Sequence, residues 1–289
     1  MKVIHTVTSL NEALAPYRFS GATIGFVPTM GALHEGHATL ARQCVSENKV
    51  CVVSVFVNPT QFNNEEDLRL YPRTLEADCK LLETLGATFV FAPSENEMYP
   101  EPDVRVFDFG NLEKVMEGRF RDGHFNGVAQ IVSKLFDFVK PDAAYFGEKD
   151  FQQLAIVRKM TKQLELPIRI IGVPTVRETN GLAMSSRNQR LSETEKTNAA
   201  EIFRILKKSA EMTDTHTPAE IISFVTKTIN DISGLRVEYF EIVDGNSLQP
   251  LSSWQNANYT VGCIAVFCGD VRLIDNIQYR SPLNPPQGT

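Results

Sequence analysis

The chain has 289 residues, of which 43% are hydrophobic and 22% are charged, a balance typical of a globular protein with its own buried core. This composition excludes disordered, collagen-like and disulfide-stapled classes, and because no apolar run reaches about 20 residues it offers no membrane span. The net charge of −6 argues against nucleic acid as a partner, since surfaces that bind phosphate backbones are basic.

Strand-like and helix-like segments alternate through the first 175 residues. Apolar and β-branched runs predict strands over residues 23–29, 50–57, 87–91, 143–146 and 168–173. Helices are expected over residues 37–47, 74–85, 128–139 and 151–164. A longer irregular stretch, residues 92–127, interrupts the alternation. The alternation predicts an α/β fold with a doubly wound parallel sheet, in a domain that spans residues 1–175.

Beyond residue 175 helices come first and strands follow. Ser192 and Glu195 form a capping-box pattern ahead of a helix that runs to about Met212, and Thr217-Pro218 starts a second helix. Strands are expected over residues 236–243, 259–267 and 271–277. We therefore expect a smaller α+β domain over residues 176–289, whose Pro-rich tail, residues 281–289, is disordered.

The five cysteines are an odd number, and no two of them form a C-x-x-C pair. Several lie in apolar runs, as Cys51 does in VCVVSVFV, which is typical of reduced thiols that pack as small hydrophobes. The N-terminal residues also lack the apolar segment of a secretory signal. We expect a protein of a reducing compartment whose cysteines take no part in its chemistry.

The densest motif is VPTMGALHEGH, residues 27–37, directly after the first of these strands. In an open parallel sheet, ligands bind beyond the carboxyl ends of the strands, and the N-terminus of the next helix presents amide donors to phosphates. Gly31 and Gly36 allow the backbone to approach a phosphate, and His34 and His37 can donate hydrogen bonds to it. The motif is neither G-x-G-x-x-G nor a P-loop. The alternatives are a purely structural role and a zinc site, although no third ligand follows at a suitable spacing.

Two further motifs follow predicted strands at the same edge of the sheet. In FVNPTQF, Asn58 and Gln61 offer neutral donors for a small polar substrate, although Asn-Pro is also a common turn. In FGEKDFQQL, Lys149 would reach phosphates from the end of a strand, and Asp150 can cap the next helix. That helix starts with two glutamines, of which one can face the cleft. An ordinary charged turn is the alternative.

The fourth motif, GLAMSSRN over residues 181–188, follows the last predicted parallel strand. Ser185, Ser186 and Arg187 provide two hydroxyl groups and a guanidinium suited to phosphate oxygens, whereas alone they would fit a solvated linker. Together with the His-x-Gly-His turn, this loop predicts ATP binding and attack at the α-phosphorus. Four polar motifs at the carboxyl ends of predicted strands favour one shared site over chance placement.

In order and spacing, PTMGALHEGH, FVNPTQF, YPRT, HFNGV, FGEKDFQQL and VPTVRETNGLAMSSRN resemble the motifs of the pantothenate synthetase (pantoate–β-alanine ligase) family. The resemblance covers residues 20–190 and is less distinctive beyond them. It implies a Rossmann-like fold of the nucleotidyltransferase type that carries the His-x-Gly-His motif. It also implies an ATP-dependent ligase that joins (R)-pantoate to β-alanine through a pantoyl adenylate and releases AMP and pyrophosphate.

The resemblance further implies which residues form the site. Catalytic roles would fall to His34, Lys149 and His37, with His37 as the usual proton donor. ATP would contact Met30, Gly31, His34, Gly36, His37, Gly147, Glu148, Lys149, Asp150, Val176, Met184, Ser185, Ser186 and Arg187. Pantoate and β-alanine would contact Asn58, Gln61, Tyr71, Arg121, His124 and Gln153. Asp150 is the residue expected to associate with a metal ion.

Beyond the site, the resemblance implies that ATP is used with Mg²⁺, that the protein is cytoplasmic, and that it is a homodimer formed mainly by the N-terminal domains. The reaction needs no general base, because the pantoate carboxylate is already ionised at pH 7. It needs groups that bring an anion to a polyanion and that stabilise the departing pyrophosphate.

Two other functions stay open at this point. A nucleotidylyltransferase of a coenzyme pathway would share the His-x-Gly-His turn, but FVNPTQF and FGEKDFQQL are not expected there. A catalytically silent nucleotide-binding protein or an RNA-binding module would share the fold. The net charge of −6 weighs against RNA binding, and the intact polar motifs weigh against a silent protein.

Overall fold

The computed structural model describes residues 1–62 and 65–281, and this part of the chain contains two sheets. The first has six strands in the order β1-β4-β3-β2-β5-β6, and every adjacent pair is parallel. Its strands are β1 (Lys2–Ile4), β2 (Ile24–Thr29), β3 (Val50–Val55), β4 (Phe89–Phe91), β5 (Ala143–Gly147) and β6 (Arg169–Val173). The predicted doubly wound parallel sheet is confirmed. Because β2 pairs with both β3 and β5, the strand order reverses at β2.

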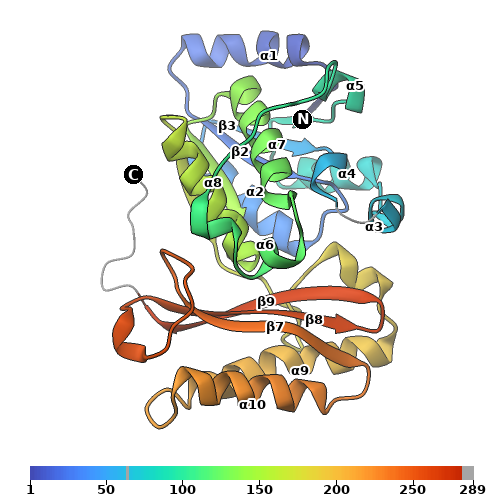
Figure 1. Cartoon of the computed structure of the whole chain (residues 1–289). Helices are drawn as coiled ribbons and strands as arrows, with labels where there is room; N and C mark the ends of the chain where they lie inside the picture. The colour runs from blue at the N-terminus through green and yellow to red at the C-terminus, as the bar shows by residue number, and fades with distance from the viewer. Residues whose placement is uncertain (63–64, 282–289) are drawn as a thin grey trace.

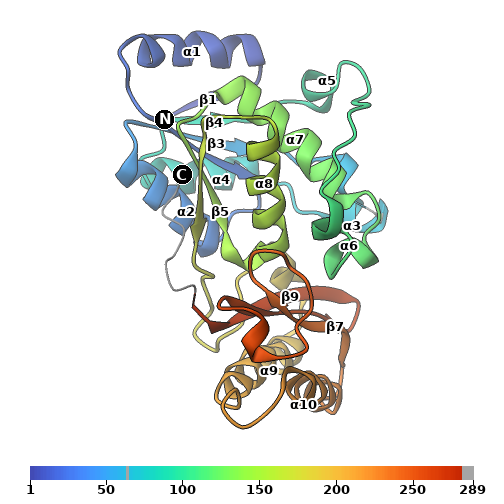
Figure 2. The same ribbon diagram turned by 60° about the vertical axis from the view of Figure 1, so that its left-hand side comes forward.

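Helices cover both faces of this sheet, as Figures 1 and 2 show. One face is covered by α1 (Val7–Phe19), α7 (His124–Val139) and α8 (Phe151–Gln163). The other is covered by α2 (Glu35–Glu47) and α4 (Leu75–Thr84). Shorter elements link them: α3 (Glu65–Leu70), α5 (Glu95–Met98), α6 (Glu117–Phe120) and the 3₁₀ turns η1 (Pro59–Gln61), η2 (Gly110–Glu113) and η3 (Glu148–Asp150).

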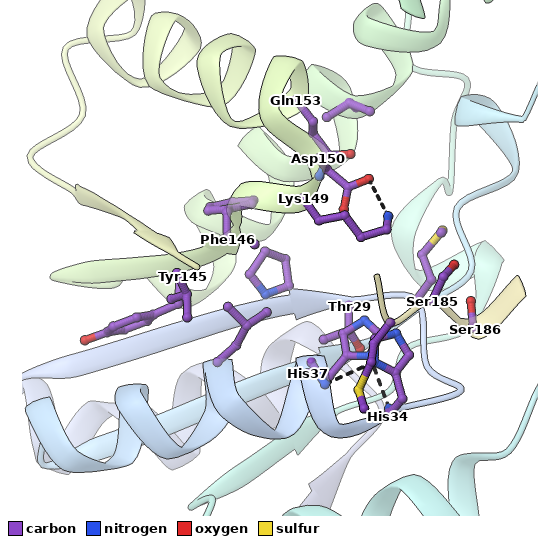
Figure 3. A pocket seen from close by; sticks show the side chains of 18 of the residues that line it. Thr29, His34, His37, Tyr145, Phe146, Lys149, Asp150, Gln153, Ser185 and Ser186 are labelled. Carbon is purple, nitrogen blue, oxygen red and sulfur yellow. Dashed lines mark hydrogen bonds and ion pairs between the residues drawn. The ribbon is translucent and has the colours of Figure 1, made fainter. Parts of the chain in front are cut away.

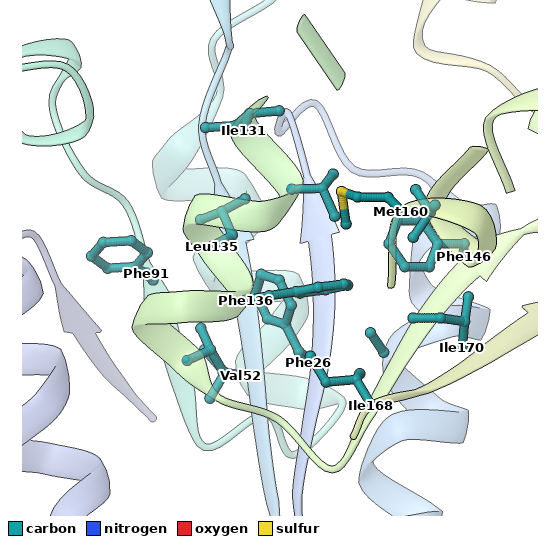
Figure 4. Close-up of a cluster of buried hydrophobic side chains, with 14 of the residues drawn as sticks. Phe26, Val52, Phe91, Ile131, Leu135, Phe136, Phe146, Met160, Ile168 and Ile170 are labelled. Carbon is teal, nitrogen blue, oxygen red and sulfur yellow. The ribbon is translucent and has the colours of Figure 1, made fainter. Parts of the chain in front are cut away.

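The central strands send alternate side chains into two separate apolar layers. Phe26 and Val52 pack on the α7 side, whereas their neighbours Val27 and Val53 pack on the α2 side. Figure 4 shows the first layer, in which Phe26 meets Phe136 edge to face with ring centroids 6.3 Å apart. Because both faces are buried, these strands are continuous apolar runs, which is why the sequence pattern predicts them.

The N-terminal elements are not predicted by the sequence pattern. No element is expected before residue 23, yet β1 and α1 lie there. Pro16 lies inside α1, and proline usually ends a helix, so the sequence gives no helix signal at this place. α7 also begins at His124 rather than at residue 128, because Gly123 adopts a φ of 71° and redirects the chain into the helix.

The second sheet is antiparallel, in the order β7-β8-β9, and it carries two helices on one face. The elements are η4 (Ser186–Arg190), α9 (Glu193–Ala210), α10 (Pro218–Asn230), β7 (Leu235–Asp244), η5 (Trp254–Asn256), β8 (Thr260–Cys268) and β9 (Val271–Arg280). The predicted capping box from Ser192 to Glu195 is present, and a second one, from Thr217 to Glu220, lies at the predicted start of the next helix. In Figures 1 and 2 the sheet lies between these helices and the parallel-sheet region.

Two predictions are left untested by the structure, and two other features follow from it directly. The division of the chain at residue 175 stays a prediction, and the tail expected to be disordered lies, except for Ser281, outside the described residues. All five cysteines are free thiols, with Cys79 partly exposed and the others buried. Among helices in residues 1–62 and 65–281, none is long and apolar enough to cross a membrane.

A buried ion pair joins the two sheet regions. The Glu117 carboxylate accepts hydrogen bonds from Arg272 of β9 at 2.7 and 2.8 Å and from the Tyr239 hydroxyl of β7 at 2.8 Å. Burial alone would raise the pKa of Glu117, but hydrogen bonds from Arg272 and its positive charge outweigh burial and lower the pKa to about 2. The carboxylate is thus charged inside the junction and depends on its partner across it.

Replacing Glu117 by Gln should therefore cost stability at neutral pH. A carboxyl group with a pKa lowered from 4.5 to about 2 stabilises the folded state above pH 4.5 and loses that effect as the pH falls towards 2. We expect Glu117→Gln to lower the free energy of unfolding by about 3 kcal/mol at pH 7, and the difference from the wild type to shrink on acidification. Urea unfolding at pH 7, 4 and 3 measures this.

The matched control is Glu76→Gln, which removes an exposed carboxylate that pairs with Lys80 on α4. An exposed pair contributes less than about 1 kcal/mol, so this variant should unfold almost as the wild type does. Equal small losses in the two variants would show that the Glu117 carboxylate does not hold the junction.

Candidate active site

A cavity lies at the carboxyl ends of β2, β3, β5 and β6, at the point where the strand order reverses. Ligands of open parallel sheets bind at such switch points. Figure 3 shows that His34 and His37 lie across the cavity from Lys149, Asp150 and Gln153. The loop ahead of η4 closes a third side. The four polar motifs of the sequence therefore meet at one place.

The turn between β2 and α2 is held by a carboxylate from α4. Gly31 and Ala32 both adopt positive φ angles, 83° and 50°, and such a backbone is unfavourable for alanine. The buried Asp78 accepts hydrogen bonds from the main-chain N–H groups of Ala32 at 3.0 Å and Leu33 at 2.8 Å. Asp78 thus stabilises the strained turn that leads into the N-terminus of α2.

Both histidines of the motif use Nδ1 to accept hydrogen bonds from the backbone. The Gly36 N–H donates to Nδ1 of His34 at 3.1 Å, and the His34 N–H donates to Nδ1 of His37 at 3.4 Å. Each ring therefore carries its proton on Nε2. Loss of solvation in the cleft, with the nearby charge of Lys149, lowers the pKa of His34 to about 4 and that of His37 to about 3. Both rings are neutral hydrogen-bond donors at pH 7.

The opposite wall is the η3 turn and the start of α8. Lys149 Nζ lies 3.4 Å from an Asp150 carboxylate oxygen, and the Lys149 side chain is 17% exposed. The two glutamines have separate roles. Gln152 is buried and bonds the main chain of Leu112, Val115 and Glu117. Gln153 lines the cavity, so it is the glutamine available to a ligand.

Gln61 is held at the cavity by Asn58 and by two further side chains, Arg121 and His124. The buried Asn58 amide donates to the Gln61 side-chain oxygen at 3.3 Å, and its own oxygen accepts from the Tyr99 hydroxyl at 2.7 Å. The main-chain oxygen of Gln61 accepts from Arg121 at 3.3 Å and from His124 Nδ1 at 2.9 Å. Asn58 lines the cavity, yet most of its polar atoms are engaged in shaping this loop.

Arg187 and Tyr71 form the third side together with the serine loop. The Ser185 hydroxyl caps the η4 turn, and the buried Ser186 hydroxyl donates to Tyr71 at 3.3 Å. Arg187 donates to Asp67 of α3 at 2.6 Å, and its guanidinium lies 6.0 Å from the Tyr71 ring centroid. The guanidinium is thus held at the rim by an acid of the N-terminal region.

A smaller side cavity adjoins the main one and shares Met30, Gln61, Lys149, Asp150, Gln153 and Arg187 with it. Arg121 and His124 line only this side cavity. Desolvation and the charge of Arg121 lower the pKa of His124 to about 4, so its imidazole is neutral and donates through Nδ1.

Two of the expected ATP contacts lie outside the lining of both cavities. Gly31 allows the positive φ angle that the turn requires, but it does not line either cavity. Glu148 points towards Gly172 of β6. The remaining expected residues that line the main cavity are Met30, His34, Gly36, His37, Asn58, Gln61, Tyr71, Gly147, Lys149, Asp150, Gln153, Val176, Met184, Ser185, Ser186 and Arg187.

Sequence reasoning missed Asp78 and the apolar floor of the cavity. Strand-end residues such as Thr29, Phe56 and Val173 line the floor, and their places at the ends of predicted strands are a usable signal. Asp78 gives no such signal, because it contacts Ala32 from 46 positions away.

Within the described residues, no three His, Cys, Asp or Glu side chains gather as a metal cluster. Asp150 is the one carboxylate expected at the phosphate site that lines the main cavity, and its side chain is 45% exposed. The residues therefore suit a cation carried in by phosphate groups, with at most a single carboxylate from the protein, as Mg²⁺ often binds.

Comparison with known proteins agrees with this geometry. A family model described as pantoate-beta-alanine ligase matches residues 2–278. A pantothenate synthetase from Bacteroides fragilis is 61% identical over 280 residues, which cover 97% of this chain and 99% of that protein. The crystal structure of pantothenate synthetase from Thermus thermophilus is 42% identical with a TM-score of 0.91, over 97% of this chain and 100% of that chain.

A third relative carries ligands. The pantoate-beta-alanine ligase from Francisella tularensis, solved in complex with beta-gamma ATP and beta-alanine, is 34% identical with a TM-score of 0.83. The match covers 98% of this chain and 99% of that chain. Since one family model spans nearly the whole sequence and relatives match over their full length, this chain belongs to the pantoate-beta-alanine ligase family.

Proposed function

We propose that the protein condenses (R)-pantoate with β-alanine at the expense of ATP, and that it releases pantothenate, AMP and pyrophosphate. The observation that carries the proposal is the single cavity that unites a histidine pair, Lys149 and the serine loop with two glutamines, Gln61 and Gln153. The relative solved with beta-gamma ATP and beta-alanine supports the same substrates.

In the first step a pantoate carboxylate oxygen attacks the α-phosphorus of ATP. The bond between the α-phosphorus and the bridging oxygen breaks, and pyrophosphate leaves with the bonding electrons. Lys149 and Arg187 supply positive charge beside the departing group, while the N-terminus of α2 adds the positive end of the helix dipole. No proton has to leave pantoate, so no base is needed.

His34 and His37 enter this step as neutral hydrogen-bond donors. Their Nδ1 atoms are occupied by backbone N–H groups, so each ring can offer one Nε2–H to a phosphate oxygen. The proton-donor role expected for His37 requires a cationic ring, which its lowered pKa does not give before a polyanion binds. We therefore assign both rings to hydrogen bonding of the phosphates.

In the second step the neutral β-alanine amine attacks the acyl carbon of the adenylate, and the bond from that carbon to the phosphate oxygen breaks. AMP leaves with the bonding electrons, and the proton that the nitrogen loses passes to the phosphate of AMP or to water. We assign Gln61 and Gln153 to the pantoyl group, because both line the main and the side cavity. The side cavity offers Arg121 and His124 on the β-alanine side. The cation at Arg121 suits the β-alanine carboxylate.

Mg²⁺ fits this site as a companion of the ATP phosphates. Bound there, it would neutralise phosphate charge, and Asp150 is the residue that would approach it. The exposure of Asp150 and its pairing with Lys149 are compatible with such a partial role.

Three further properties are proposed from the family resemblance. They are a cytoplasmic location, a domain boundary near residue 175, and a homodimer formed mainly by the N-terminal domains. Val104 and Val106, which are 85% and 87% exposed, offer apolar surface in the N-terminal region for such a contact. Sedimentation of the purified protein as a single-chain species would argue against the dimer.

Pyrophosphate release tests the proposed function. With ATP, Mg²⁺ and pantoate alone, we expect one equivalent of pyrophosphate per active site in a burst, because the adenylate stays bound. Adding β-alanine should convert the burst into steady turnover with AMP and pantothenate as products. Absence of a burst with pantoate would overturn the substrate assignment, and turnover without pantothenate would indicate a transferase.

Variants should separate the phosphate side of the cavity from the pantoate side. Lys149→Ala and His37→Ala each remove a group that stabilises phosphate charge, so the burst rate should fall by about 100-fold or more. Gln153→Ala should mainly raise the KM for pantoate. Stopped-flow pyrophosphate detection at varied pantoate and ATP measures both. Full activity of His37→Ala would exclude its assignment.

The tautomers of the site histidines are directly measurable. We expect His34, His37 and His124 to stay neutral as the pH falls from 8 to 5, because each has a pKa of about 4 or below. Imidazole ¹⁵N NMR should show the Nε2–H form for His34 and His37 and the Nδ1–H form for His124. A ring that titrates near pH 6.5 would contradict this arrangement.

A further inference from the structure

Strand β9 of the C-terminal sheet sends two adjacent side chains towards the walls of the active site. The Asn276 side-chain amide donates to two successive main-chain oxygens, those of Glu148 at 2.8 Å and Lys149 at 3.0 Å. The Asp275 carboxylate accepts from Arg177 at 2.7 and 2.9 Å. Lys149 lines one wall of the cavity, and Glu148 precedes it in the same turn. Arg177 begins the segment that leads to Ser185, which lines another wall.

The contact of Asn276 falls on the short turn that presents Lys149. η3 is three residues long, with Lys149 at its centre and its side chain facing the cavity. An amide NH₂ group has two donors, and here they meet two consecutive carbonyl groups. The contact therefore defines the orientation of both peptide groups that flank the Lys149 Cα.

Asn276 is itself held in place by its neighbours. It pairs with Cys263 in the β8–β9 register, its N–H donates to Asp275 at 2.7 Å, and its main-chain oxygen accepts from Arg177 at 3.4 Å. The Arg177 guanidinium in turn lies 3.4 Å from the Phe203 ring centroid of α9. The amide is thus anchored to the C-terminal core and acts on the N-terminal region.

We propose that Asn276 is a positioning residue for Lys149. By fixing the main chain of the η3 turn, it places the ammonium group where pyrophosphate develops charge. Asn276 also lines the side cavity, but both donors of its amide are directed to the η3 carbonyl groups. This inference rests on the proposed function of Lys149 in adenylate formation. A shift of about 1 Å in such a group is enough to slow a reaction by about 100-fold.

The test is the rate of the pantoate-dependent pyrophosphate burst in Asn276→Ala. We expect a burst 10- to 100-fold slower than in the wild type, with the dissociation constant of a non-hydrolysable ATP analogue changed by less than about threefold. The attack of β-alanine on adenylate that is already formed should proceed at the wild-type rate, because Lys149 acts on the departing pyrophosphate. Asn276→Gln, which keeps the amide donors, should recover part of the rate.

A matched control lies on the same strand. Gln278 lies two residues beyond Asn276 on β9, and its side chain donates to Ser281. Gln278→Ala therefore removes an amide of β9 that makes no hydrogen bond to η3. We expect its burst rate to equal that of the wild type. Thermal unfolding of both variants separates a local shift of Lys149 from a general loss of the C-terminal sheet.

A double-mutant cycle with Lys149→Ala decides the route of the effect. If Asn276 acts through Lys149, removing the amide in the Lys149→Ala background should cost little further rate. Additive losses, or a wild-type burst in Asn276→Ala, would overturn the inference while the wild-type burst still supports the proposed function. Absence of a burst in the wild-type protein would instead overturn the proposed function.

Discussion

The cavity lies where two sheets with separate apolar cores meet, and the charged groups buried at that junction have to be paired. A buried carboxylate without a partner costs several kcal/mol, so each acid at the junction fixes the position of a base on the other side. Glu117 binds Arg272 in this way, whereas Asp275 and Arg177 pair within the C-terminal region, beside the junction. Both acids line the side cavity, and their partner bases lie outside the lining of both cavities. The relative position of the two sheets is therefore set by ion pairs as well as by apolar contacts. The positions of the residues that line the site depend on both.

The charge available to a polyphosphate is limited by the same need for pairing. Lys149 contacts Asp150, Arg187 contacts Asp67, and the two site histidines are neutral because they are desolvated in the cleft and backbone N–H groups occupy their Nδ1 atoms. An incoming polyanion must share the two cations with these acids or displace the acids from them. This competition weakens the binding of the ground state. Interactions that strengthen only as pyrophosphate departs contribute to the rate rather than to affinity. A cavity with paired cations and neutral donors is therefore suited to stabilising the departing pyrophosphate more than the bound ATP.

Much of this arrangement can be read from the sequence, because the buried strands are apolar runs and the polar motifs directly follow them. The doubly wound sheet, the Ser192 capping box and the convergence of His37, Lys149 and Arg187 all follow from such local patterns. Contacts between distant segments cannot be read in this way. Asp78 and Asn276 lie in an ordinary helix and an ordinary strand, and only the packing of those elements shows that each holds a loop of the site. The choice between two adjacent glutamines likewise depends on the helix phase, which is fixed by tertiary contacts.

The chemistry of the amide explains why it suits position 276. A carboxylate there would face two carbonyl oxygens and repel them, and it would also draw the Lys149 ammonium away from the phosphates. An ammonium group could donate to both oxygens, but it would place a second positive charge beside Lys149. The two cations would then repel each other. An uncharged NH₂ group holds both carbonyls and leaves the local potential to Lys149 alone. Where a catalytic cation must be placed without being perturbed, a neutral donor anchored in a neighbouring sheet meets both requirements.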